Sequence, residues 1–171
     1  VKEKGFFELL KAFESLLKIY PKIHLIIAGS YLSSDYKNSA IDEINLVKKN
    51  YPNKISLLGQ VDRIEEIYNI MDIFCLPSYR EGLPYTLIEA MLCNLPIITT
   101  NIRGCRELID NEKNGLLVEV KNSEAVYQGI KKYLENIDIA NEYSNKAREK
   151  ALYYHNEKVI IKNHLKILNS I

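Results

Sequence analysis

Short apolar runs alternate with longer helical patterns along the whole sequence, and this alternation constrains the fold more than any other feature. Four of the runs are mostly apolar, which is typical of strands covered on both faces, as in a parallel sheet. The expected strands are Leu25–Ala28, Ile55–Leu58, Ile73–Leu76, Ile97–Thr99 and a weaker Leu116–Val118. Strands that alternate with helices through right-handed crossovers predict an α/β fold with a doubly wound parallel sheet, Rossmann-like in layout.

The expected helices lie before, between and after these runs. The first spans about 5–20, has apolar residues three and four positions apart, and closes at Pro21. The others are expected at 39–51, 64–71, 85–92, near Glu107, at 123–135, at 140–154 and at 159–168. We therefore expect a single domain over residues 1–171, with a core at about 4–135 and carboxyl-terminal helices at about 140–169.

The composition argues against several classes of function. Of the 171 residues, 47% are hydrophobic and 26% are charged, a balance typical of globular domains. The net charge is +1, which offers no basic surface for a nucleic acid. Apolar runs stay far below the roughly 20 residues that span a bilayer. Cys75, Cys93 and Cys105 show no paired spacing, so we expect free thiols in the cytoplasm rather than zinc ligands or disulfides.

The least ordinary segment runs from Pro77 to Met91. It leaves an apolar strand, places Glu81 and Gly82 in a loop, and begins a helix at about Pro84. Ligands of doubly wound sheets bind at the carboxyl ends of the strands, and the free amides of a helix start attract phosphate oxygens. We expect Gly82 to supply a positive φ or a close backbone approach, so the segment predicts a phosphate-binding loop.

Two acids frame this loop. Glu81 and Glu89 are eight residues apart, which on a helix means about 12 Å of rise and roughly 80° of rotation. They are too distant to share one proton or one metal ion. The spacing instead fits two carboxylates that each accept hydrogen bonds from a pair of sugar hydroxyls, at opposite ends of a diphosphate.

The segment from Glu81 to Met91 resembles the E-x7-E signature of the group 1, or family 4, retaining glycosyltransferases. Other stretches resemble the family's landmarks in the same order, namely Lys4-Gly5, Gly59-Gln60-Val61, Arg103–Ile109 and Asn114–Val118. The resemblance implies the carboxyl-terminal half of a GT-B enzyme, in which two Rossmann-like domains face each other across a cleft. Because no strand precedes the first helix, we expect the acceptor domain to lie outside this chain.

The resemblance also implies a role for each site residue. Glu81 would contact the transferred sugar and Lys4 the diphosphate, and these two are the expected catalytic groups. The expected donor-binding residues are Glu89 for the ribose, Val61 for the base, and Gly82, Leu83, Pro84, Tyr85 and Thr86 for the phosphates and the sugar. Lys4 and the helix start would stabilise the charge that grows on the departing diphosphate. No metal or other cofactor is implied.

The implied reaction is transfer of a hexosyl or N-acetylhexosaminyl group from a UDP- or GDP-sugar to a glycan or lipid-linked acceptor, with retention of configuration. Alone, the chain is expected to bind nucleotide weakly and to transfer nothing. Two alternatives stay open: a GT-B sugar-nucleotide epimerase and a non-catalytic nucleotide-sugar-binding or interaction domain. We expect a cytoplasmic location, with peripheral attachment of the full-length enzyme to the inner face of the membrane as a further alternative.

The sequence departs from the family's pattern at three places. Asn94 stands where the family usually has a glycine, and because asparagine tolerates the left-handed conformation, we expect the helix end to survive. The family's second diphosphate-binding residue, an arginine about six positions before Lys4, would fall ahead of Val1. Leu83-Pro84 replaces a commoner pair, which leaves the identity of the sugar open.

Overall fold

The computed structural model describes residues 2–29 and 40–154, and the helix expected at 159–168 lies outside this part of the chain. The described elements alternate as the sequence predicts. They are η1 (Lys2–Lys4), α1 (Phe6–Leu17), β1 (Leu25–Ala28), α2 (Ala40–Asn50), β2 (Ile55–Gly59), α3 (Ile64–Tyr68), β3 (Phe74–Leu76), α4 (Tyr85–Leu92), β4 (Ile97–Thr100), α5 (Arg103–Arg106), β5 (Leu116–Val118), α6 (Ser123–Glu135) and α7 (Ile137–Tyr154).

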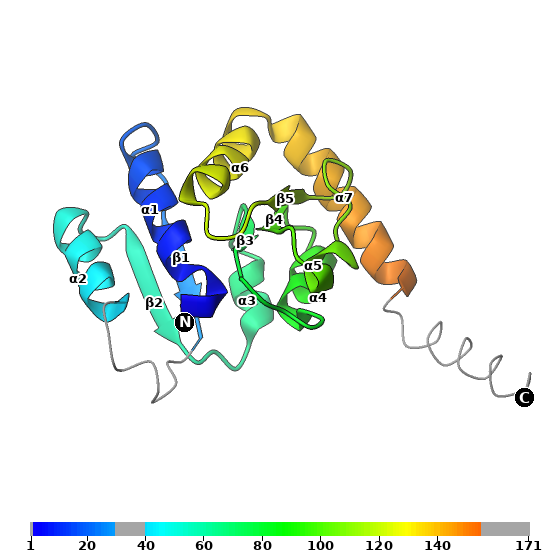
Figure 1. Ribbon diagram of the computed structural model, residues 1–171, viewed down its shortest axis with the longest axis horizontal. Coiled ribbons are helices and arrows are strands. Elements are labelled where there is room, and N and C mark those ends of the chain that lie inside the picture. The colour runs from blue at the N-terminus through cyan, green and yellow to red at the C-terminus, as the bar shows by residue number, and fades with distance from the viewer. Residues whose placement is uncertain (1, 30–39, 155–171) are drawn as a thin grey trace, which may run out of the picture.

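All five described strands pair in parallel, so the predicted α/β fold with parallel, Rossmann-like winding is confirmed. The strands form two ladders, β1-β2 and β3-β4-β5. Figure 1 shows β1 and β2 beside α1 and α2, while β3 to β5 lie at the centre with α6 and α7 around them. Among the described residues, β1 and β3 share no ladder, and a cavity of about 1050 Å³ lies between their edges.

Burial of the strands differs from the prediction of cover on both faces. Every residue of β4 is buried, as expected for the centre of a parallel ladder. In β2, by contrast, Ile55 is buried while Leu57 and Leu58 are 37% and 40% exposed. The apolar cluster that covers β2 draws on α1 and α2 and takes in Ile55 at the start of the strand. The prediction was wrong for β2 because this cover does not reach the strand's carboxyl end.

Helix α1 joins the two halves of the core. Leu10, Phe13 and Leu17 pack in one apolar cluster with Ile44 and Val47 of α2. Ala12, also buried, belongs instead to a cluster that includes residues of β4, β5 and α6. A helix with apolar residues on both of these faces is typical of a buried element between layers. A third cluster packs α4 and α7 against β4.

Two tight turns depend on residues that accept a positive φ. Asn94 follows α4 with φ 61°, which confirms the left-handed helix end expected from the sequence. Gly5 precedes α1 with φ 68°. A Cβ at Gly5 would lie 1.9 Å from the Pro77 carbonyl oxygen, far inside van der Waals contact. The absence of a side chain at Gly5 is therefore what lets the start of α1 approach the end of β3.

Replacing Gly5 by alanine should destabilise the fold by more than about 2 kcal/mol, because the left-handed conformation and the clash with Pro77 both oppose a Cβ. Urea unfolding measures this loss. Gly82→Ala is the matched control: Gly82 has no positive φ and a Cβ there meets nothing within 4 Å, so stability should change by no more than about 0.5 kcal/mol. Equal losses in both variants would contradict the packing argument.

Candidate active site

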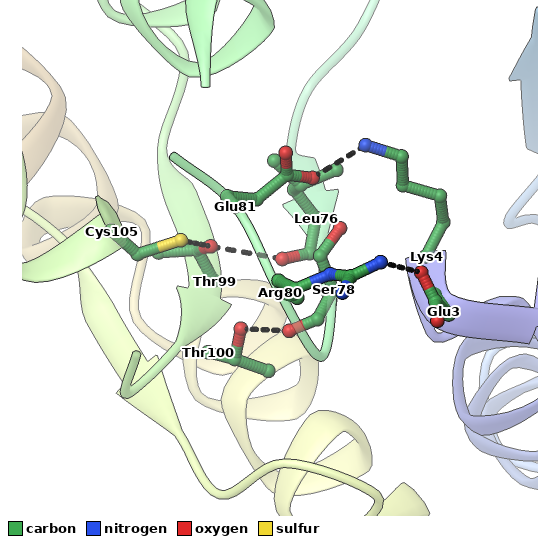
Figure 2. Close-up of polar contacts among 9 residues, drawn as sticks. All are labelled: Glu3, Lys4, Leu76, Ser78, Arg80, Glu81, Thr99, Thr100 and Cys105. Atoms are coloured by element: carbon green, nitrogen blue, oxygen red, sulfur yellow. Dashed lines mark hydrogen bonds and ion pairs between the residues drawn. The ribbon is translucent and has the colours of Figure 1, made fainter. Parts of the chain in front are cut away.

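The segment before α1 meets the loop between β3 and α4 through two crossed ion pairs. The Lys4 Nζ donates to the Glu81 Oε1 at 2.7 Å, and the Arg80 Nη2 donates to the Glu3 Oε2 at 2.9 Å. The backbone is tied as well, because the Tyr79 amide donates to the Glu3 carbonyl at 2.7 Å. Figure 2 shows both pairs bridging from the amino-terminal segment to the loop.

The two partners of the Lys4–Glu81 pair differ in exposure. The Glu81 side chain is 13% exposed, whereas Lys4 is 59% exposed. An ion pair with one exposed partner adds little to stability, so its importance lies in position rather than in energy. Lys4 has three N–H donors and spends one on Glu81, which leaves its outward side free to bind an anion. The structure thus brings together the two groups that the sequence analysis selects as catalytic.

Beneath the loop, strand β4 supplies hydrogen bonds to the end of β3. The Thr99 hydroxyl lies 2.9 Å from the Leu76 carbonyl and 3.0 Å from the Cys105 Sγ, and the Thr100 hydroxyl donates to the Ser78 carbonyl. Figure 2 shows these side chains on the opposite side of the loop from Lys4. Burial raises the pKa of the Cys105 thiol, so this group serves in packing rather than as a nucleophile.

Gly104 supports the same loop by close packing. A Cβ at Gly104 would lie 2.1 Å from the Gly82 carbonyl oxygen and 2.5 Å from the Glu81 carbonyl oxygen. Gly104 is buried in α5, which begins just after β4. The loop that carries Glu81 therefore rests directly on this helix, with no space for a side chain between them.

Tyr79 fastens the loop to α1. Its hydroxyl donates to the Glu8 Oε1 at 2.6 Å, and the Lys121 Nζ lies 5.2 Å from the centre of its ring. Burial, and then the bond to Glu8, raises the pKa of Tyr79 to about 12. The phenol is consequently a neutral donor at physiological pH and holds the Glu8 carboxylate against the loop.

Helix α4 spans the residues predicted for it, with Pro84 buried at its N-cap. The residues around this helix start, Gly82, Leu83, Tyr85 and Thr86, are exposed. Of the two possibilities expected for Gly82, the positive φ was wrong, and no chain atom lies within 4 Å of the position that a Cβ would take there. Gly82 instead leaves open space in front of the helix start, which is the end that attracts anions.

Glu89 differs from Glu81 in its surroundings. It lies on α4 and is exposed. Its Oε2 nonetheless accepts a hydrogen bond of 3.0 Å from the hydroxyl of Tyr68, a residue 3% exposed. Glu81 lies four residues before α4 begins, so helical spacing does not describe the separation of the two acids.

The cavity between the two ladders extends to the edge of the molecule where Lys4 and the start of α4 lie. Three of the expected site residues, Lys4, Val61 and Thr86, line it, together with Tyr68. Gly59, with φ 64°, ends β2 and turns the chain toward Val61. Within the described ranges, no group of three His, Cys, Asp or Glu side chains is placed to hold a metal ion, and no helix is long and apolar enough to cross a membrane.

Sequence reasoning did not find several residues of this site. Glu3, Arg80, Glu8 and Tyr68 all contact expected site residues or their loop. Their partners lie between 21 and 77 positions away, and the sequence has no local pattern that pairs residues at such distances. The packing of Gly5 on Pro77 brings the amino-terminal segment and the loop after β3 together.

A sequence profile of the family described as "Glycosyl transferases group 1" matches residues 1–150. The chain belongs to the group 1 glycosyltransferases. The resemblance inferred from the E-x7-E segment is therefore confirmed. The matched range holds all of the candidate site residues.

Two curated relatives and one solved structure are similar to this group 1 chain. An uncharacterised glycosyltransferase of Haemophilus influenzae is 31% identical over 158 residues, which cover 92% of this chain and 43% of that protein. The Escherichia coli UDP-Gal:alpha-D-GlcNAc-diphosphoundecaprenol alpha-1,3-galactosyltransferase is 30% identical over 128 residues, 75% of this chain and 32% of that protein. The chain thus spans less than half the length of these relatives.

The solved structure of Anabaena HepE in complex with UDP superposes with a TM-score of 0.89 at 21% identity. The superposition covers 100% of this chain and 46% of HepE. At this identity the similarity concerns the fold alone, and it supports the Rossmann-like architecture of this domain.

Replacing Gly104 by alanine should lift the loop from α5, because a Cβ would overlap the Gly82 carbonyl. The Tyr79 amide, which donates to the Glu3 carbonyl, reports on the loop, and its hydrogen exchange should become roughly tenfold faster. Gly129→Ala is the control, since a Cβ in this buried α6 glycine meets only side-chain atoms at 3.4 Å or more. An unchanged Tyr79 exchange rate in Gly104→Ala would contradict this support.

Proposed function

We propose that this chain is the donor-binding half of a glycosyltransferase that takes a sugar from a nucleoside diphosphate. The observation that carries the proposal is the contact of Lys4 with Glu81 at the mouth of a cavity that Val61 and Thr86 also line. A cation, a helix start and a carboxylate then lie at one edge of the parallel strands, where such folds bind ligands. The family membership supports the same assignment.

UDP is the favoured nucleotide, with GDP as the alternative donor. HepE was solved with UDP, and the Escherichia coli relative is named for UDP-Gal. In this proposal the backbone near Val61 contacts the base, Glu89 binds the ribose hydroxyls, and the segment from Gly82 to Thr86 faces the phosphates and the sugar. Glu81 contacts the transferred sugar, a hexosyl or N-acetylhexosaminyl group.

The chemistry follows from where charge develops. As the bond between the anomeric carbon and the diphosphate oxygen breaks, negative charge grows on the departing nucleotide. The Lys4 ammonium and the amides at the start of α4 stabilise that charge most in the transition state. We propose that transfer proceeds without a metal ion, since Lys4 and α4 supply the positive charge. We further propose that the transferred sugar keeps its configuration.

The acceptor would be a glycan or a lipid-linked sugar, as the name of the Escherichia coli relative says of that protein. Its binding is assigned to sequence beyond these residues, because the relatives are more than twice as long as the matched part. We propose a cytoplasmic enzyme that works at the inner face of the membrane. Release of free nucleotide during turnover separates a transferase from an epimerase.

Calorimetric titration of the chain should detect UDP binding, weaker GDP binding, and no effect of EDTA on either. Glu89→Gln should weaken UDP binding roughly tenfold or more, because the ribose hydroxyls lose a charged acceptor. Glu142→Gln on α7 changes another exposed carboxylate and should leave the affinity unchanged. Equal affinities of the wild type and Glu89→Gln would contradict the donor-site assignment.

The Lys4→Gln variant should distinguish the contribution of the diphosphate to binding from the contribution of the uridine part. Loss of the ammonium should weaken UDP roughly tenfold while leaving the affinity for uridine unchanged, because uridine carries no phosphate. Lys11→Gln on the exposed side of α1 is the matched control. If Lys4→Gln lowered the affinities for UDP and uridine equally, the assigned role of Lys4 would be wrong.

A further inference from the structure

We propose that Tyr68 is the positioning residue for Glu89, and that its hydroxyl fixes the carboxylate in the orientation that receives the ribose hydroxyls. This inference rests on the proposed function, in which Glu89 binds the ribose. Tyr68 lies on α3, outside the E-x7-E segment, and neither motif spacing nor composition singles it out. Only the hydroxyl group has this positioning role, since the ring has a separate packing role.

The hydroxyl of Tyr68 has two possible acceptors and one proton. The Glu89 Oε2 lies at 3.0 Å and the Thr86 carbonyl at 3.4 Å. A carboxylate is the stronger acceptor, so the shorter contact takes the proton. Burial, and then the bond to Glu89, raises the pKa of Tyr68, which keeps the phenol protonated as a donor.

The ring is held firmly behind this bond. Tyr68 is 3% exposed, and its ring packs edge-on against Phe74 with centroids 5.8 Å apart. Glu89, by contrast, is exposed. A free glutamate loses up to about 2 kcal/mol of side-chain entropy when a ligand orders it. A rigid donor beneath it removes part of that loss before the ligand arrives, which is preorganisation.

The bond also leaves Glu89 ready for a ligand. In the part of the chain that the structure describes, Tyr68 is the only side chain that hydrogen-bonds Glu89, and it uses Oε2. Oε1 keeps its lone pairs for hydroxyl donors. Tyr68 lines the same cavity as Val61, and α3 begins three residues after Val61. One short helix would thus link the base-binding turn to the ribose-binding carboxylate.

The test compares UDP with 2′,3′-dideoxyuridine diphosphate, which lacks the hydroxyls that Glu89 binds. Tyr68→Phe removes the hydroxyl and keeps the ring. We expect this variant to bind UDP about tenfold more weakly and to bind the dideoxy nucleotide with unchanged affinity. A merely structural role would weaken both nucleotides alike, and that result would overturn the inference.

Tyr133→Phe is the matched control. Tyr133 is 2% exposed, and its hydroxyl donates to the Ile97 carbonyl at 3.1 Å, so this variant also removes one buried hydroxyl. It should lower stability about as much as Tyr68→Phe and leave the affinity for UDP unchanged. An equal loss of UDP affinity in the two variants would overturn the inference.

A double variant separates this inference from the proposed function. In the Glu89→Gln background, Tyr68→Phe should cause no further loss of UDP affinity. If Glu89→Gln weakens UDP but Tyr68→Phe does not, the inference fails and the proposed function stands. If Glu89→Gln itself has no effect, the proposed function fails, and the inference fails with it.

A measurement on the wild-type chain covers the case in which Tyr68→Phe does not fold. With tyrosines labelled at the ring Cζ, the Tyr68 resonance should shift on addition of UDP and stay unchanged with the dideoxy nucleotide. The same shift with both nucleotides, or with neither, would overturn the inference.

Discussion

The close approach of Gly5 to the Pro77 carbonyl is the contact on which the rest of this site depends. No residue with a Cβ fits there, since its first side-chain atom would lie 1.9 Å from the carbonyl oxygen. Where the two backbones meet, Lys4 pairs with Glu81 and Glu3 pairs with Arg80. A steric requirement at one glycine therefore fixes an electrostatic arrangement between segments that are far apart in the sequence.

The loop that receives Lys4 is supported from beneath by uncharged contacts. Thr99 and Thr100 bind carbonyls at the end of β3, and Gly104 lets α5 come within contact of the Gly82 carbonyl. Because these partners are buried and neutral, they hold the backbone without competing for a charged ligand. Positive charge and free amides then lie on the outer side of the loop, where a diphosphate would approach.

Local patterns in the sequence predicted much of this architecture. The bounds of α4 and β5, the parallel pairing and the left-handed Asn94 follow from apolar periodicity and turn chemistry, which act over a few residues. The separate β1-β2 ladder, the exposed end of β2 and the open space at Gly82 did not follow. These three features depend on how elements that are far apart in the sequence pack against one another. The Tyr68–Glu89 hydrogen bond was not predicted for the same reason, since no sequence pattern links α3 with α4.

We expect a nucleoside diphosphate to bind at the edge formed by the amino-terminal segment, the β3–α4 loop and the turn after β2. Mapping of backbone amide chemical shifts in the nitrogen-labelled chain, with and without UDP, tests this directly. The largest shifts should cluster at Gly82, Leu83, Tyr85, Thr86 and Val61. Shifts confined to α6 and α7, or no shifts at saturating UDP, would contradict it.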